Sequence, residues 1–254
     1  MEHLRWIGFA AFFASSLVVG VRLLLLARRT GKLPEFLIGI GVLGIGPFGY
    51  GLLMLAFVLA SHSLALSATL MGSALLATSI GAISQYLFVW TVFRRNAPWA
   101  RSVIWMAIAL LLAGYVGDLL ENGLVNRQNS GGWFWLGAVM RTSGLGWSSL
   151  ESLRYHRIMR SRMRLGLADP VVTESFRLWG LGAGAAFSGS LLGLGTRALT
   201  GHGAVEFPIL NLVLSLLGLL AAIAIWLAFL PTPALLRFVE SRGRRAGALP
   251  SAPG

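Results

Sequence analysis

The stretch that decides the fold is residues 7–29, IGFAAFFASSLVVGVRLLLLARR, in which Arg22 is the only charge before Arg28 and Arg29. About 20 apolar residues in a helix cross the roughly 30 Å hydrocarbon core of a bilayer. This stretch therefore predicts a membrane-spanning helix. A cleaved signal peptide carries its basic residues before a shorter apolar run. Here the basic pair follows the run, so we expect a retained anchor.

Six more long apolar segments follow this stretch, separated by short polar or basic links. We expect an all-α, polytopic membrane protein, a bundle of seven transmembrane helices forming one domain over residues 1–231. Residues 232–254 are expected to form a short basic cytoplasmic tail with a disordered Ala/Gly/Pro-rich end. The expected spans are about 6–27, 35–60, 66–93, 102–121, 133–153, 175–197 and 208–230.

The composition supports this class, since 56% of the 254 residues are hydrophobic and 12% are charged. A soluble domain carries about 25% charged residues. The chain has no cysteine, which excludes disulfide frameworks, thiolate metal sites and cysteine nucleophiles. We expect a multi-pass protein of the cell membrane, specifically of a bacterial inner membrane. The net charge of +12 lies mainly between apolar segments, so nucleic acid is not an expected partner.

The basic residues also predict an orientation, because such residues stay on the cytoplasmic side of the membrane during insertion. The N-terminus and the second, fourth and sixth links hold only Arg5, Arg127 and Arg197. We therefore expect the N-terminus outside and the C-terminus in the cytoplasm. The first, third and fifth links and the tail hold most of the others: Arg28, Arg29, Lys32, Arg94, Arg95, Arg101, Arg154, Arg157, Arg160, Arg162, Arg164, Arg237, Arg242, Arg244 and Arg245.

Two segments are rich in glycine, GIGVLGIGPFGYG over 39–51 and GLGAGAAFSGSLLGLG over 180–195. Small residues at helical spacing let helix backbones approach closely in a membrane. The expected role is a tight seam within the chain, with a homodimer face or ligand access as alternatives. Pro47 is expected to kink the second helix. The candidate packing residues in the sixth segment are Gly180, Gly184, Gly189 and Gly193.

Both glycine-rich segments follow a basic link, a proline and a glutamate: Pro34 and Glu35 in one case, Pro170 and Glu174 in the other. If segments 1–3 and 5–7 were parallel repeats joined by segment 4, the arrangement would be three-plus-one-plus-three. Paired repeats around a central site are common in transporters. A repeat is therefore one hypothesis for this chain.

Ionisable residues inside a membrane are functional candidates because charge is costly there. At the inner end we expect an ion-pair network, with Arg22 able to reach Glu151. Structural pairing and a coupling network that rearranges are the two interpretations. The residues are Arg22, Glu35, Glu151, Glu174 and Arg177.

In the outer half, Asp118 and Glu121 share one helix face because they are three residues apart. Arg141 lies about 12 Å below the outer end of its segment, at 1.5 Å per residue. We expect Arg141 to pair with Asp118 on the neighbouring helix. One hypothesis is a polar ligand-binding pocket, and the other is a salt bridge that docks the two helices. Tyr115 would line the pocket, with a rim formed by Arg197, His202 and Glu206.

The sequence predicts no catalytic residues, no metal site and no cofactor, and we lean against an enzyme. The histidines are His3, His62, His156 and His202, and none forms an HExxH motif. Gly117-Asp118 lacks the second membrane aspartate of an intramembrane aspartyl protease. The topology resembles that of rhodopsins and G-protein-coupled receptors. The last segment has no lysine for retinal, and the Asp-Arg-Tyr and Asn-Pro-x-x-Tyr motifs are absent, so no family follows.

The first functional hypothesis is a receptor-like or sensory membrane protein that binds a small apolar or amphipathic ligand in its outer half. It would act through a cytoplasmic or membrane protein partner. The alternatives are a small uncoupled transporter or facilitator with the three-plus-one-plus-three arrangement, and a membrane subunit of a larger complex. The lipid bilayer is a partner in every case.

Overall fold

The computed structural model describes residues 2–123, 131–203 and 206–247, and within these ranges all regular structure is helical. The predicted all-α class is confirmed for this part of the chain. The elements are α1 (Glu2–Thr30), α2 (Leu33–Ile45), η1 (Gly46–Gly51), α3 (Leu52–Leu59), α4 (Leu64–Phe93), α5 (Pro98–Asn122), α6 (Gly132–Arg164), α7 (Pro170–Thr200), α8 (Pro208–Phe229) and α9 (Pro233–Gly247).

Proline and glycine mark many helix ends. Proline stands within the first two positions of α2, α5, α7, α8 and α9, where its missing N–H costs nothing. Glycine with positive φ follows α1, α5, α6 and α7, at Gly31, Gly123, Gly166 and Gly201. Only glycine adopts that left-handed conformation without a steric penalty. The residues that start and end the helices therefore favour the short links seen between them.

Six helical stretches are long and apolar enough to cross a membrane, so the chain has the character of a multi-pass membrane protein. They match six of the seven expected segments. The seventh, 133–153, lies in α6, which is long enough but more polar than the others. The six are Phe9–Thr30, Leu33–Leu59, Leu64–Phe93, Pro98–Glu121, Pro170–Thr200 and Pro208–Phe229.

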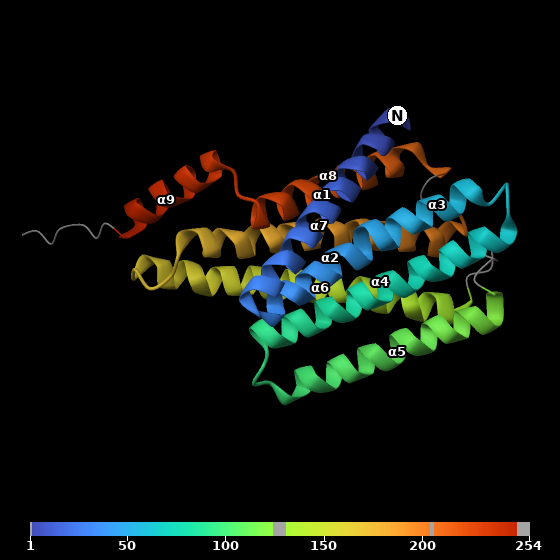
Figure 1. Ribbon diagram of the computed structural model, residues 1–254, viewed down its shortest axis with the longest axis horizontal. Coiled ribbons are helices and arrows are strands. Elements are labelled where there is room, and N and C mark those ends of the chain that lie inside the picture. Colours follow the sequence, from blue (N-terminus) through green and yellow to red (C-terminus); the bar gives the residue numbers. More distant parts are fainter. Residues whose placement is uncertain (1, 124–130, 204–205, 248–254) are drawn as a thin grey trace, which may run out of the picture.

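The helices form a ring that follows the order of the chain (Figure 1). Each of α1, α2, α4, α6, α7 and α8 packs against the next, and α8 closes the ring on α1, while α5 lies outside against α4 and α6. The α1–α2, α4–α5, α6–α7 and α8–α9 links lie at one end, and the α3–α4 link lies at the opposite end. The first three helices of the ring pack against one another in the same order as the last three, as two repeats would. Any ring that follows the order of the chain has this property. The repeat therefore remains a hypothesis.

The second span contains a π-helix where we expected a simple kink at Pro47. α2 passes into η1, which includes Pro47, and then into α3. Proline lacks an N–H and its ring clashes with the carbonyl four residues earlier in an α-helix. The wider π turn absorbs that conflict without ending the helix. Such π segments are frequently found at functional sites.

The glycines of this span form close seams with both neighbouring helices. A Cβ on Gly44 would lie 2.8 Å from the Ala77 carbonyl oxygen and 3.0 Å from the Gly81 Cα of α4. A Cβ on Gly46 would lie 2.5 Å from the Ser16 Cβ of α1. The glycine run therefore sets the spacing between α1, the second span and α4.

The predicted packing glycines of α7 separate into three environments. Gly180 and Gly184 face α6 closely, since added Cβ atoms would lie 2.8 Å from Leu153 and 2.9 Å from Ser149. Gly189 makes ordinary contacts with α8, and Gly193 has nothing within 4 Å of an added Cβ. The seam with α6 thus depends on the first two.

The half of the ring nearer the basic links is filled by one hydrophobic cluster. Its members come from five helices and lie toward the ends of those helices that carry these links. An aromatic series from Phe88 through Trp179 to Phe229 extends across it. This half of the ring is therefore packed with apolar side chains. The cluster consists of Val19, Leu23, Leu37, Ile38, Val42, Phe88, Val89, Trp179, Ile225 and Ala228.

The tail contains a helix, α9, which we did not expect. α9 packs against α6 and α7, and Val239 is buried in that contact. Apolar residues at helical spacing (Leu235, Leu236, Val239) explain why this basic segment folds back onto the bundle. The predicted disordered end, 248–254, lies outside the described residues.

The close approach of α2 and α4 can be tested by Gly44→Ala. Because backbone atoms surround the site, we expect a loss of stability of about 1–3 kcal/mol, as for an overpacked core. Gly218→Ala in α8, which has open space around it, is the matched control and should not lower stability, because alanine favours a helix over glycine by up to about 1 kcal/mol. Thermal unfolding in detergent measures both. Equal melting temperatures would contradict the α2–α4 contact.

Candidate functional site: an outer polar cluster

The candidate site is built on α6, whose polar residues face into the bundle. Thr142, Ser148, Ser149 and Ser152 are all buried. Leu150 is 71% exposed on the outward face of the same helix. Polar residues inside and apolar residues outside are the distribution expected for a helix of a membrane-embedded bundle, where polar groups find their partners within the protein.

Glycines bring α5 and α6 together at the level of the site. A Cβ on Gly114 would lie 2.9 Å from the Gly137 nitrogen, and Gly117 lies directly against the Trp133 ring. Gly137 also leaves room for the Arg141 guanidinium, whose Nη1 would lie 3.0 Å from an added Cβ. The crossing therefore places Asp118, one residue after Gly117, beside the face that carries Arg141.

The structure brings together three of the predicted charged residues. Asp118 is 8% exposed, and its carboxylate interacts electrostatically with the guanidinium groups of both Arg141 and Arg197. The Arg197 Cζ also lies 4.6 Å from the centroid of the Phe134 ring on α6, a cation–π distance. Arg197 was expected at the rim, and it instead belongs with the central pair. The site thus joins α5, α6 and α7.

Tyr50 is a fourth member that sequence reasoning missed. It lies on η1 with its phenol near the Arg141 guanidinium, and it packs edge-on against Phe12 with ring centroids 6.0 Å apart. Its sequence signal was a tyrosine between two glycines, three residues after Pro47, inside an apolar span. We call Asp118, Arg141, Arg197 and Tyr50 the outer polar cluster.

Other predicted members have different positions. The Tyr115 hydroxyl donates to the Gly72 carbonyl of α4 at 3.4 Å, so it connects α5 to α4. Glu121 is exposed, with its carboxylate against Gly131 at the start of α6. His202 and Glu206 form an exposed pair with 2.8 Å between Nδ1 and Oε2, within the α7–α8 link. These residues surround the cluster without completing a ligand shell.

Hydrogen bonds fix α6 to its neighbours below the cluster. Tyr86 of α4 lies 2.7 Å from the Ser143 hydroxyl and donates to the Met140 carbonyl at 3.0 Å. On the other side, Ser149 donates to the Gly180 carbonyl of α7 at 2.7 Å. Arg141 is therefore carried by a helix that is held from both sides. Buried side-chain oxygens with no partner among the described residues are Ser16 Oγ, Gln85 Oε1 and Ser152 Oγ.

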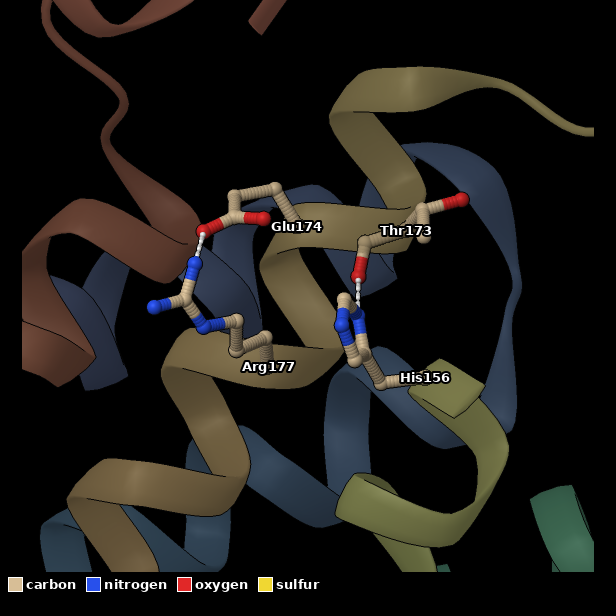
Figure 2. Close-up of polar contacts among 4 residues, drawn as sticks. All are labelled: His156, Thr173, Glu174 and Arg177. Carbon is tan, nitrogen blue, oxygen red and sulfur yellow. Dashed lines mark hydrogen bonds and ion pairs between the residues drawn. The ribbon is translucent and has the colours of Figure 1, made fainter. Parts of the chain in front are cut away.

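At the inner end, the expected ion-pair network is replaced by local contacts. Glu151 pairs with Arg94, the residue that caps α4, at 2.6 Å rather than with Arg22, which is exposed. Arg22 does not reach Glu151 because it is directed away from the bundle. Glu35 accepts a hydrogen bond from Thr30, and Glu174 pairs with Arg177 one turn along the same helix (Figure 2).

The described residues contain no group of three or more His, Cys, Asp or Glu side chains that could hold a metal ion. The geometry supplies paired guanidinium and carboxylate groups and a phenol within a membrane-spanning bundle. Comparison with known protein families, with curated proteins and with solved structures finds no match to this chain.

Proposed function

We propose that this chain is a receptor-like membrane protein that crosses the bilayer seven times and binds a small amphipathic ligand at the outer polar cluster. The observation that supports it most is the gathering of Asp118, Arg141 and Arg197 from three helices. Charged residues in a membrane protein usually face the bundle interior and mark functional pathways or sites.

The seventh crossing in this proposal is α6. This helix packs against α4, α5 and α7 and so lies within the ring of apolar helices. Its polarity comes from residues that face inward, while Val139 and Leu150 face outward. At 1.5 Å per residue its 33 residues extend about 50 Å, more than enough for the hydrocarbon core.

The proposed orientation places the outer polar cluster on the extracellular side. The basic links lie at one end of the bundle, which is the cytoplasmic end by the positive-inside rule. The hydrophobic cluster fills that half of the ring, whereas the opposite half holds the charged groups. A ligand from outside would therefore meet polar groups before it met the apolar seal.

Arginine favours carboxylate and phosphate groups because its planar guanidinium donates two parallel hydrogen bonds. An amphiphile with an anionic headgroup is therefore the ligand class we propose to test first. Its apolar tail would lie along the exposed apolar surfaces of the neighbouring helices, such as Leu112 and Val116 of α5.

A facilitator is the second candidate, and η1 is the observation that favours it. Interrupted helices commonly form transporter sites near the middle of the membrane. Tyr50 on η1 contributes to the outer polar cluster, so a change in the π segment would move a group of the site. The three-plus-one-plus-three arrangement belongs to this alternative.

Single-cysteine labelling tests the seven crossings, and it is clean because the chain has no cysteine. Gly132→Cys lies at the start of α6, in open space, and Leu167→Cys lies exposed beyond its end. In intact cells a membrane-impermeant maleimide should label the first variant. The second should be labelled only after the membrane is opened. Labelling of both from one side would show that α6 does not cross.

Thermal shift of the detergent-purified protein tests ligand binding, with alkyl phosphates, fatty acids and a neutral alcohol of equal chain length as probes. A ligand at 100 times its Kd adds about 2.7 kcal/mol of stability. We expect a saturable rise in melting temperature for an anionic probe, which is lost in Arg141→Ala. The matched control, Arg95→Ala at the opposite end of the bundle, should retain the rise.

The reciprocal exchange Asp118→Arg with Arg141→Asp separates binding from scaffolding. It should restore part of the stability that either single change removes, because opposite charges again face each other. It should not restore the response to an anionic probe. If no probe shifts the parent protein and the exchange restores full stability, the cluster is a salt bridge that docks α5 on α6.

A further inference from the structure

The cytoplasmic surface of interest is the tip of the α6–α7 hairpin, which we define as residues 157–169. Arg94 caps α4 and pairs with Glu151, so Glu151 marks the level at which α4 ends. The 13 residues of α6 after Glu151 continue for about 20 Å. Figure 1 shows the α6–α7 turn projecting beyond the α1–α2 and α4–α5 turns.

The base of the projecting part is held by paired polar groups. His156 donates through Nδ1 to the Thr173 carbonyl at 2.9 Å, which joins α6 to the first turn of α7 (Figure 2). Glu174 and Arg177 neutralise each other at 2.8 Å beside it. The arginines beyond this level are therefore carried on a helix pair that is fixed at its base.

The tip has a large uncompensated positive charge. Arg157, Arg160 and Arg162 are exposed and make no ion pair with any described residue. Asp169 is the acidic residue of the tip, and its carboxylate accepts the backbone N–H groups of Val171 and Val172 as a helix cap. The carboxylate of the tip is thus already engaged.

Two leucines lie exposed among these arginines. The N–H of Gly166 donates to the Met163 carbonyl, and the N–H of Leu167 donates to the Arg162 carbonyl, which ends α6 in a Schellman motif. The residue after the glycine usually packs on an apolar side chain of the last helical turn. In α6 the positions that would provide this apolar side chain are Ser161 and Arg162, so Leu167 has no apolar residue to pack on. Leu165 and Leu167 are 74% and 73% exposed.

We propose that the hairpin tip is a docking surface for a cytoplasmic protein that presents an acidic rim around an apolar pocket. Leu165 and Leu167 would enter the pocket, and Arg157, Arg160 and Arg162 would face the rim. The proposal rests on the orientation argued above and supplies an output for the proposed receptor.

The dimensions and charges of the chain argue against other occupants. In the proposed orientation the lipid headgroups lie near the level of Arg94, and Leu165 and Leu167 lie about 20 Å beyond that level. Electrostatic attraction is screened over about 8 Å at physiological salt, so the end of the tip lies beyond the reach of the lipid surface. A second copy offers few acidic groups, since the whole chain has 9 acidic and 21 basic residues. Nucleic acid would leave the two leucines without a partner.

Photo-crosslinking of the full-length protein in intact cells of its native host tests the proposal. Leu167 is replaced by p-benzoyl-phenylalanine, and Leu199, which is 88% exposed at the opposite end, is the control position. We expect a discrete protein adduct from position 167 and not from 199. The triple change Arg157→Glu, Arg160→Glu, Arg162→Glu should lower its yield about tenfold or more, since like charges across an interface cost several kcal/mol. The corresponding lysine triple should retain it.

The melting temperature of each triple variant should equal that of the parent, because the side chains are exposed, and this excludes misfolding as the cause. A protein adduct that is indifferent to the glutamate changes would overturn the proposal. So would no adduct at position 167, or adducts only with phospholipid, nucleic acid or a second copy. If the adduct persists in Arg141→Ala and the parent protein shows no response to any ligand, the docking surface stands and only the proposed ligand site is wrong.

Discussion

The structure depends on one constraint, which is that a charged group inside the hydrocarbon is stable only where it finds a partner within the protein. α6 carries Arg141, Thr142 and a series of serines through the middle of the bundle. Leaving such groups toward lipid costs several kcal/mol each. α4, α5 and α7 enclose this helix, and its apolar residues Val139 and Leu150 lie on the narrow face that stays exposed. The position of α5 outside the ring follows, since Asp118 must reach Arg141 from that side.

The two halves of the bundle are built differently, and this difference bears on function. The half nearer the basic links is packed with leucine, valine and aromatic side chains from five helices. The opposite half holds Asp118, Arg141 and Arg197, together with a π segment that brings Tyr50 near Arg141. A permanent conduit would require polar groups through both halves. In the proposed orientation, a polar outer half above an apolar inner half supports the proposed binding role.

The sequence was sufficient for the six apolar spans because burial in lipid is a property of whole segments. The helix ends were less exact, since α7 runs from Pro170 to Thr200 where the expected span was 175–197. The ion-pair partner of each charged residue was harder to predict than the spans, because it depends on how each helix is rotated about its axis. Glu151 pairs with Arg94 and not with Arg22, since Arg22 faces away from the bundle. Tyr50 was missed for the same reason, as the π turn that orients it arises from steric conflict at Pro47.

The same helix links the outer site to the proposed cytoplasmic surface. α6 carries Arg141 in its outer half and Arg157, Arg160 and Arg162 beyond its inner half, without a described break between them. A helix of this length moves largely as a rigid body when its side chains are packed on both sides. Its contacts with α7 are close and hydrogen-bonded, as where Ser149 donates to the Gly180 carbonyl, so α7 would move together with α6. The Arg94–Glu151 pair lies between the two sites, so any shift of α6 that a ligand produced would have to strain or move with this ion pair.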